Sequence, residues 1–430
     1  MPLSRRTFLA GGAAAAAGLT GLTGLTGCGS RSSLGAANEL SMWTWVGSVN
    51  DDLISQAEKS IPGYDTLKLS MTRIGSNYKT KVLTALAGKS LVPDIVAIND
   101  DVATYFPNAD QFHDLNELGA KEREADFLPW KWKLGITPQN KMMAYPMDTG
   151  PTALFYRSDI LAKAGIDIDP AAIAEQAPDW DSYIALAQKI KQAVPGSAIT
   201  DNINSVFAYR MAQQPKRYMA ADGQYIGDQD HVREAFDLAV RVVKDGLSAN
   251  AQDGSTDSKA VVSNGKLVAF NAAVWWAQLG PKNAAPKTKG NWRVAAPPGG
   301  PGNRGGSFLA ITKYCKNPQA AFAFISWLES AQNQAQAFLD PVLFPSTPAS
   351  YTDSRLSAPD EFFGGQQIVD VFAESAKKYP GAFFSPYDSI IGSPLSAELV
   401  NIETGGKSPD QAWADAQRQI ERELTRAGAI

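Results

Sequence analysis

The sequence predicts an α/β protein in which helices pack on largely parallel sheets. From residue 38 onward, short apolar runs alternate with amphipathic helical patterns, the order of elements that such layered folds require. The chain has 430 residues, of which 44% are hydrophobic, so it can bury a sizeable core without disulfides or metal ions. At about 100–200 residues per domain, we expect two to four domains.

The first elements are predicted from their caps and breakers. Residues 40–46 form an apolar run that predicts a strand. Asn50 or Asp51 is expected to cap the helix that follows, and Pro62-Gly63 to stop it, because these residues favour such positions. A second strand is expected over residues 67–72.

The remaining elements follow from apolar stripes and bounded apolar runs. Ser76 is expected to cap a helix that ends at Gly88. Further elements are expected, in order, as a strand buried on both faces over 95–98, a strand over 153–156, a helix from Ser158 to Gly165, a helix from Asp179 or Asp181 to Val194, a helix over 232–243, strands over 267–270 and 307–312, a helix from Pro318 to Leu328 and a last helix from Ser408 to Leu424.

Three stretches rich in Gly or Pro are candidate crossings between two lobes. They are Tyr145–Pro151, Pro297–Gly306 and Phe344–Pro348. Each is flanked by regular elements, as hinges often are. Three crossings would make each lobe discontinuous in sequence. Residues 200–225 are expected to shape any pocket, but their path does not follow from the sequence.

Composition and motifs exclude several classes of function. With 44 acidic and 40 basic residues, the chain lacks the charge that a nucleic-acid backbone attracts. Its two Cys and two His lie too far apart for a closed zinc site, so we expect no metal and no cofactor. No Gly-x-Ser-x-Gly nucleophile motif occurs. Gly300-x-Gly302-x-x-Gly305 precedes a predicted strand, whereas a dinucleotide site needs a helix there.

The N-terminus carries the features of an export signal. Ser4-Arg5-Arg6-Thr7-Phe8-Leu9 resembles a twin-arginine signal, and Leu25-Thr26-Gly27-Cys28 resembles the lipobox of bacterial lipoproteins. Residues 1–27 are therefore expected to be a signal peptide, Cys28 the lipidated residue and residues 28–37 a flexible tether. The alternative is an N-terminal tail with chance motifs. Cys315 is expected to be a small buried apolar residue.

Seven short motifs along the mature chain point to a family. The motifs are, in order, Trp43-Thr44-Trp45, Tyr78-x-x-Lys81-x-x-Thr84-Ala85-Leu86-Ala87, Pro93-Asp94-Ile95-Val96, Tyr145-Pro146-x-x-Thr149-Gly150, Phe155-Tyr156-x-x-Asp159, Trp180-Asp181-x-Tyr183 and Gly265-Lys266-x-x-Ala269-Phe270. They resemble those of extracellular solute-binding proteins of the family-1 type, the lipoprotein receptors of bacterial carbohydrate ABC importers, similar to maltose-binding protein. The likeness covers residues 39 to about 425.

The resemblance implies a two-lobe periplasmic-binding-protein-like fold of type II with a ligand cleft between hinge-connected lobes. It implies an N-terminal lobe of residues 38–147 plus 305–345 and a C-terminal lobe of 148–304 plus 346–430. It further implies a monomeric, non-enzymatic receptor, anchored by lipid to the outer face of the cytoplasmic membrane. Such a receptor binds a carbohydrate ligand and docks on the permease subunits of an ABC transporter.

Candidate ligand contacts combine aromatic rings with acids and amides. Sugar C–H faces pack on aromatic rings, and hydroxyl groups need carboxylates, amides or Arg. Ligands in open parallel sheets sit at the carboxyl ends of strands. Position within the predicted elements and the family pattern together select Trp45, Asn99, Asp101, Asp148, Trp275, Trp276 and Asp388.

Each candidate also has a purely structural explanation. Tryptophan side chains more often pack in the hydrophobic core than contact a ligand. Asp101 and Asp388 stand where helix caps are expected, and the alternative role of Asp148 is to accept hydrogen bonds from backbone amides at the first crossing. Trp275 is favoured over Trp276 by its spacing from Phe270. Arg304 is a further candidate for a hydroxyl or phosphate, with a solvated loop residue as the alternative.

Two other functions stay open on the sequence alone. A receptor for a polyamine would use several acids beside aromatic rings, and one for a glycerol phosphate ester would need Arg or a helix N-terminus. An exported glycoside hydrolase would use Asp101 with Asp148 or Asp388 as its carboxylate pair.

Overall fold

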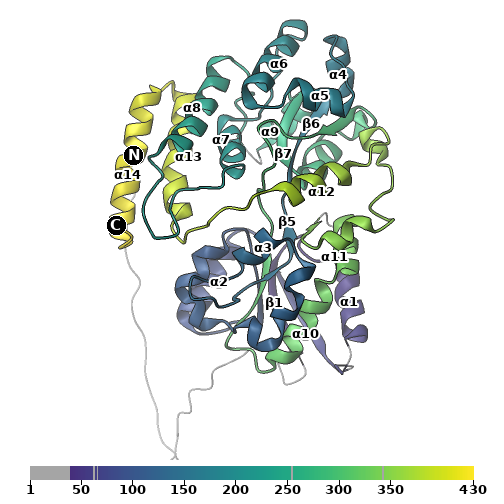
Figure 1. Cartoon of the computed structure of the whole chain (residues 1–430), viewed down its shortest axis with the longest axis vertical. Coiled ribbons are helices and arrows are strands. Elements are labelled where there is room, and N and C mark those ends of the chain that lie inside the picture. The colour runs from purple at the N-terminus through teal and green to yellow at the C-terminus, as the bar shows by residue number, and fades with distance from the viewer. Residues whose placement is uncertain (1–38, 62, 65, 253–254, 341–342) are drawn as a thin grey trace, which may run out of the picture. The chain divides into compact units, whose positions relative to one another are not determined.

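The computed structural model describes residues 39–61, 63–64, 66–252, 255–340 and 343–430 (Figure 1). The predicted signal peptide, Cys28 and the predicted tether lie outside the described residues. The description below therefore begins with the first strand.

A five-stranded sheet contains the first three strands of the described chain. Its order is β2-β1-β3-β9-β4. β1 is parallel to β2 and β3, whereas β9 is antiparallel to β3 and β4. The strands are β1 (Glu39–Trp45), β2 (Lys68–Ile74), β3 (Ile95–Ile98), β4 (Tyr145–Pro146) and β9 (Phe308–Ile311).

The neighbouring inner strands β3 and β9 are buried on both faces, as predicted for residues 95–98. Ile95 and Ala97 belong to one hydrophobic cluster, and Val96 and Ile98 belong to another. β9 alternates in the same way, because successive side chains of a strand point to opposite faces. The elements around this sheet are α1 (Asp51–Ser60), α2 (Tyr78–Gly88), η1 (Val102–Gln111), η2 (Leu115–Leu118), η3 (Ala120–Asp126), α3 (Pro129–Leu134), α10 (Pro318–Leu328) and α11 (Ala331–Leu339).

The predicted caps of the first helices are confirmed in one case and wrong in the other. The Asn50 side chain accepts hydrogen bonds from the backbone N–H groups of Asp52 and Leu53, so it caps α1. Ser76 does not cap α2. The residue before that helix is Asn77, which adopts a left-handed conformation with φ of 71° and makes no side-chain cap. Asn tolerates this conformation better than most residues.

A three-stranded antiparallel sheet lies in the other part of the fold. β6 (Thr152–Arg157) pairs with β7 (Ala269–Ala273) on one side and with β8 (Trp292–Ala295) on the other. Parallel pairing occurs beside it only as single bridges, Ala198 with Leu267 and Thr200 with Ser248, among the described residues. The prediction of largely parallel sheets is therefore wrong. The five-stranded sheet is mixed and the three-stranded sheet is antiparallel, because later strands enter beside earlier ones in the opposite direction.

The helices and short helical turns around the second sheet bury its side chains in one large cluster. α6 begins after Asp179, whose side chain accepts from the Ser182 N–H, as the sequence predicted. The elements are α4 (Ser158–Lys163), α5 (Pro170–Gln176), α6 (Trp180–Ala193), α7 (Ile203–Ala212), α8 (Asp230–Lys244), α9 (Thr256–Ser263), η4 (Gln278–Lys282), η5 (Pro286–Thr288), η7 (Glu361–Phe363), α12 (Ile368–Lys378), α13 (Asp388–Gly405) and α14 (Pro409–Arg426).

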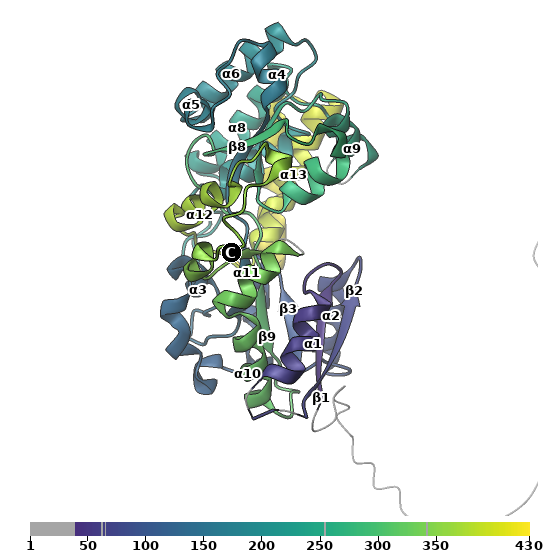
Figure 2. The ribbon, with the colours of Figure 1, turned by 90° about the vertical axis from the view of Figure 1, so that its right-hand side faces the viewer.

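The chain passes between the two sheets in the segments predicted as crossings (Figure 2). It leaves the five-stranded sheet at β4 and enters the other at β6, and it returns between β8 and β9. In the first and third segments, β5 (Asp148–Thr149) pairs antiparallel with β10 (Phe344–Pro345). The lobe boundaries themselves stay a prediction.

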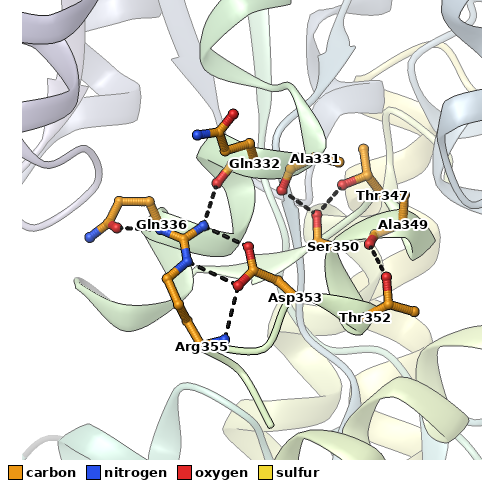
Figure 3. A network of polar contacts seen from close by, with 9 residues as sticks. All are labelled: Ala331, Gln332, Gln336, Thr347, Ala349, Ser350, Thr352, Asp353 and Arg355. Carbon is orange, nitrogen blue, oxygen red and sulfur yellow. Dashed lines mark hydrogen bonds and ion pairs between the residues drawn. The ribbon is translucent and has the colours of Figure 1, made fainter. Parts of the chain in front are cut away.

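The segment after the third crossing is tied to α11 by a polar network (Figure 3). It includes the turn η6 (Pro348–Thr352). The Ser350 hydroxyl donates to the Ala331 carbonyl at 2.7 Å, and the Arg355 guanidinium bonds Asp353 at 2.7 Å and Gln336 at 2.8 Å. Arg355 also holds the pKa of Asp353 down at about 2. These bonds fix the path of the chain where it leaves β10.

Two further findings concern the described residues as a whole. Cys315 is buried, with 7% of its surface exposed, as predicted. Among the residues that the structure describes, no helix combines the length and apolar character needed to span a membrane.

Candidate functional site

A polar pocket opens where β3 ends. Its volume is about 340 Å³. It joins the end of that strand and the start of η1 to residues just after α7 and at the start of α13. The polar pocket is lined by Asn99, Asp100, Asp101, Ala103, Thr104, Arg217, Tyr218, Phe384, Ser385, Asp388, Ser389 and Gly392. Three of the seven predicted ligand contacts, namely Asn99, Asp101 and Asp388, therefore meet at one place.

The acids after β3 have distinct partners. Asp101 precedes η1, but its side chain does not cap that turn and instead forms an ion pair with Lys79 of α2. The Asp100 Oδ2 atom accepts a hydrogen bond of 3.2 Å from the Gly305 N–H in the second crossing. Burial, together with the neighbouring Asp101 carboxylate, raises the pKa of Asp100. The end of β3 is thus bonded both to α2 and to the crossing.

Arg217 and Asp388 form the opposite wall. Arg217 Nε donates to Asp388 Oδ2 at 2.9 Å, and its guanidinium lies 4.4 Å from the centroid of the Phe384 ring. The Arg217 carbonyl oxygen lies 2.6 Å from Nε2 of His231. This Arg is therefore held from three sides, by a carboxylate, an aromatic face and a ring nitrogen.

Asp388 has one oxygen left for another partner. Its Oδ1 atom is buried and has no hydrogen-bond partner among the described residues. Burial raises the pKa of the Asp388 carboxyl, and the Arg217 guanidinium acts against that rise. Asp388 is the first residue of α13 and not its cap, so the alternative explanation of a capping role does not hold. A buried oxygen without a partner is a natural acceptor for a ligand hydroxyl.

The two candidate tryptophans differ in surroundings. Trp275 is half-buried, donates from Nε1 to the Arg304 carbonyl at 3.4 Å, and lies beside Gly305, whose N–H binds Asp100. Trp276 packs against three aromatic rings, those of Phe155, Phe270 and Trp292, with centroids 4.9–5.8 Å away. The structure thus places Trp275 next to the second crossing and gives Trp276 a packing role.

Asp148 lies in a separate cluster, which we call the buried charge cluster and which consists of Lys131, Asp148 and Glu329. All three are buried, with exposed fractions of 1%, 7% and 5%. Burial lowers the pKa of Lys131 and raises that of Glu329. The Asp148 Oδ1 atom has no hydrogen-bond partner among the described residues. Asp148 does not line the polar pocket.

Trp45 and Arg304 also stand outside the polar pocket. Trp45 is half-buried at the end of β1 and its ring meets the edge of Tyr78, 5.7 Å between centroids. The Arg304 guanidinium lies over the Tyr209 ring at 4.9 Å. That Trp45 and Arg304 contact a ligand stays a prediction.

Sequence reasoning missed Arg217 and selected Asp101 but not Asp100. Arg217 lies in the stretch 200–225 whose path the sequence leaves open, and no motif surrounds it. Asp100 follows the same buried strand as Asp101, so its strand-end position is the signal that could have included it. Among the described residues, no group of three or more His, Cys, Asp or Glu side chains is placed to hold a metal ion.

The chain is similar to known proteins in sequence and in fold. Residues 65–335 match the family model described as bacterial extracellular solute-binding protein. The lactose-binding protein of Rhizobium radiobacter is 22% identical over 392 residues, which are 87% of this chain and 90% of that protein.

Solved structures extend the likeness to the fold. A crystal structure of an extracellular solute-binding protein of family 1 has 28% identity and a TM-score of 0.84, with 89% of this chain and 99% of that chain covered. The ABC transporter associated binding protein of B. animalis subsp. lactis Bl-04, solved with β-1,6-galactobiose, has 22% identity and a TM-score of 0.73, with 91% and 99% covered.

Proposed function

The chain belongs to the bacterial extracellular solute-binding proteins, a family of transporter receptors, and from that premise we propose that it binds a neutral oligosaccharide for an ABC importer. The observation that carries the proposal is the polar pocket, in which Asn99, Asp101 and Asp388 meet Arg217. The names of the relatives, one lactose-binding and one solved with a galactobiose, support a saccharide ligand.

The pocket offers what a sugar needs. Carboxylate oxygens, such as the unpartnered Oδ1 of Asp388, accept bonds from hydroxyl groups, and the Arg217 guanidinium donates to them. The ring of Phe384 supplies an apolar face for C–H groups. Three carboxylates against one guanidinium in the lining disfavour a phosphate ester.

We further propose that the protein is exported, anchored through Cys28 to the outer face of the cytoplasmic membrane, and monomeric when it delivers its ligand to permease subunits. The Ser4-Arg5-Arg6 and Leu25–Cys28 motifs support this proposal. A Cys28→Ala variant should lose incorporation of labelled palmitate and leave the membrane fraction in cells.

The first test is a thermal-shift screen of the purified protein against saccharides, polyamines and glycerol phosphates. A ligand at 100 times its Kd adds about 2.7 kcal/mol to the free energy of unfolding, which raises Tm measurably. We expect a shift with saccharides and unchanged saccharide after incubation. A Tm shift with a polyamine or a phosphate ester alone would overturn the saccharide proposal, and released monosaccharide would support a hydrolase.

A further inference from the structure

One of the two histidines of the chain lies directly behind the pocket wall that Arg217 forms. The His231 Nε2 atom is 2.6 Å from the Arg217 carbonyl oxygen. His231 is half-buried, and its side chain does not line the polar pocket. It can therefore act on a ligand only through another residue, and Arg217 is a residue that it bonds.

The short contact determines which ring nitrogen of His231 carries a hydrogen atom. A carbonyl oxygen only accepts hydrogen bonds, so Nε2 must be the donor. A neutral ring with its hydrogen on Nδ1 would instead set two lone pairs against each other at this distance. His231 is therefore a hydrogen-bond donor to the backbone of the pocket arginine.

The stretch of chain that carries Arg217 has little else to hold its backbone at this point. It connects α7 to α8 over residues 213–229 and contains no helix or strand. Its start is fixed by the Gln213 side chain, which donates two hydrogen bonds of 2.7 Å to carbonyl groups of the second crossing. Among the described residues, the bond with His231 is the only hydrogen bond that the Arg217 backbone makes.

His231 itself belongs to a firmly packed helix. It is the second residue of α8, which packs against α7 and α13 (Figure 1). The side chains of Val232, Ala235 and Phe236 on the same helix are fully buried. Side chains on packed helices keep a more precise position than side chains on loops. The helix thus gives the arginine-bearing loop a fixed point of attachment.

We propose that His231 is a positioning residue for ligand recognition, which holds the Arg217 backbone where the guanidinium reaches both Asp388 and the Phe384 ring. A group that meets two partners at once needs its backbone within about 0.5 Å of the right place. The inference rests on the proposed function and deepens it, because it adds a residue outside the polar pocket to those that set affinity.

The first test measures affinity by isothermal titration calorimetry. The probes are lactose, β-1,6-galactobiose and any other saccharide that raises Tm in the screen. His231→Leu removes the donor and should lower affinity about 3- to 10-fold, the factor that one hydrogen bond contributes. His231→Gln keeps an N–H group that can reach the same carbonyl, so it should stay within about twofold of the wild type. His113→Leu changes the other histidine, which does not line the pocket, and should leave affinity unchanged.

A double-mutant cycle tests whether His231 acts through Arg217. In the Arg217→Lys background the guanidinium that His231 positions is absent, so adding His231→Leu should lower affinity by about twofold or less. Equal losses from His231→Leu in the wild type and in Arg217→Lys would overturn the positioning role. His231→Asn, whose shorter amide does not reach the carbonyl, replaces His231→Leu if that variant does not fold.

The ligand-free protein gives a readout that does not depend on the proposed function. The Arg217 Nε–H group donates to Asp388, so its nitrogen–proton cross-peak in NMR spectra, identified by its absence from Arg217→Lys, reports the position of the guanidinium. The peak should persist in His231→Gln and be shifted or broadened in His231→Leu. An unchanged peak in His231→Leu overturns the inference. A changed peak together with no saccharide binding by the wild type overturns the proposed function alone.

Discussion

Two sets of charged side chains in this protein differ in their ion pairing and in their exposure. In the polar pocket, Arg217 and Asp388 form a direct ion pair of 2.9 Å and keep 20% and 13% of their side chains exposed. In the buried charge cluster, Lys131 makes no ion pair with any described carboxylate, and its ammonium lies 3.4 Å from the centroid of the Phe308 ring. The first set lines the polar pocket, whereas the members of the second keep only 1–7% of their surface exposed. The two sets are linked through Asp100, which lines the polar pocket and acts electrostatically on Lys131.

This difference in pairing and exposure indicates which charged side chains can bond to a ligand. In the polar pocket, the unpartnered Oδ1 atom of Asp388 can accept a bond from a sugar hydroxyl while Oδ2 keeps its bond to Arg217. A buried set has no replacement for a lost partner, so each member fixes the others. We therefore assign recognition to the polar pocket and stability of the crossing between the sheets to the buried charge cluster. The following predictions test this division.

The largest effect is expected from removing the buried cation. Lys131→Met removes the cation that acts electrostatically on Asp148 and Glu329, and the loss of a partner for a buried polar group costs about 1–3 kcal/mol. Urea unfolding should show this decrease in the free energy of unfolding. Lys133→Met, on the same short helix but exposed, is the matched control and should change it little. Equal stability of the two variants would contradict the division.

The next effect concerns the polar pocket. Arg217→Lys keeps a positive charge but loses the Nε–H group that donates to Asp388 and the planar guanidinium that lies over the Phe384 ring. Affinity for the saccharide found in the screen should therefore fall about 10- to 100-fold. The free energy of unfolding should change less than in Lys131→Met. Arg233→Lys, which alters an ion pair with Asp237 outside the pocket, should leave affinity unchanged in the same titration.

A pH effect is expected from Glu329. Burial raises its pKa well above 4.5, so above that pH the folded protein holds a proton that the unfolded chain has released. The free energy of unfolding therefore falls as pH rises from 4.5 towards the raised pKa, by about 1.4 kcal/mol for each unit of the rise.

Glu329→Gln should remove this decline when unfolding is followed from pH 4 to pH 8. The control is Glu361→Gln, since Lys289 lowers the pKa of Glu361 and gives a dependence of opposite sign. An unchanged slope in Glu329→Gln would show that another group titrates.

The smallest effect is expected at the exposed pair of Figure 3. Asp353→Asn weakens its contact with Arg355, but exposed ion pairs contribute about 0–1 kcal/mol. The wild-type contribution should be present above pH 3.8 and disappear as pH falls through about 2. Calorimetry should compare the Tm of the wild type with that of Asp353→Asn at pH 7 and at pH 2. A decrease in the free energy of unfolding as large as that caused by Lys131→Met would contradict this order of effects.

The sequence predicts local elements of this fold well and pairing direction poorly. The strand over 95–98 and the helix from Pro318 to Leu328 match β3 and α10, because an apolar run and a Pro at the first turn are local signals. Antiparallel insertion of β9 beside β3 depends on contacts between residues more than 200 positions apart, and no local pattern records them.

The candidate site was predictable where it follows a strand end. Asn99 and Asp101 were predicted from their place directly after a buried strand, because ligands bind at the carboxyl ends of strands. Arg217 was not, since its place is set by Asp388, 171 residues away, and by the Phe384 ring. Spacing from Phe270 favours Trp275 over Trp276, but only the structure shows that the Trp276 ring packs against three other aromatic rings.

The position of β9 has a consequence for the synthesis of this protein. β3 and β4 both pair with β9, and no other described strand joins them to each other. Until Ile311 has left the ribosome, both strands have edges without partners, and such edges invite pairing with other chains. We therefore expect nascent chains that end before residue 308 to need protection by a chaperone, and the five-stranded sheet to close only when about three quarters of the polypeptide has been made.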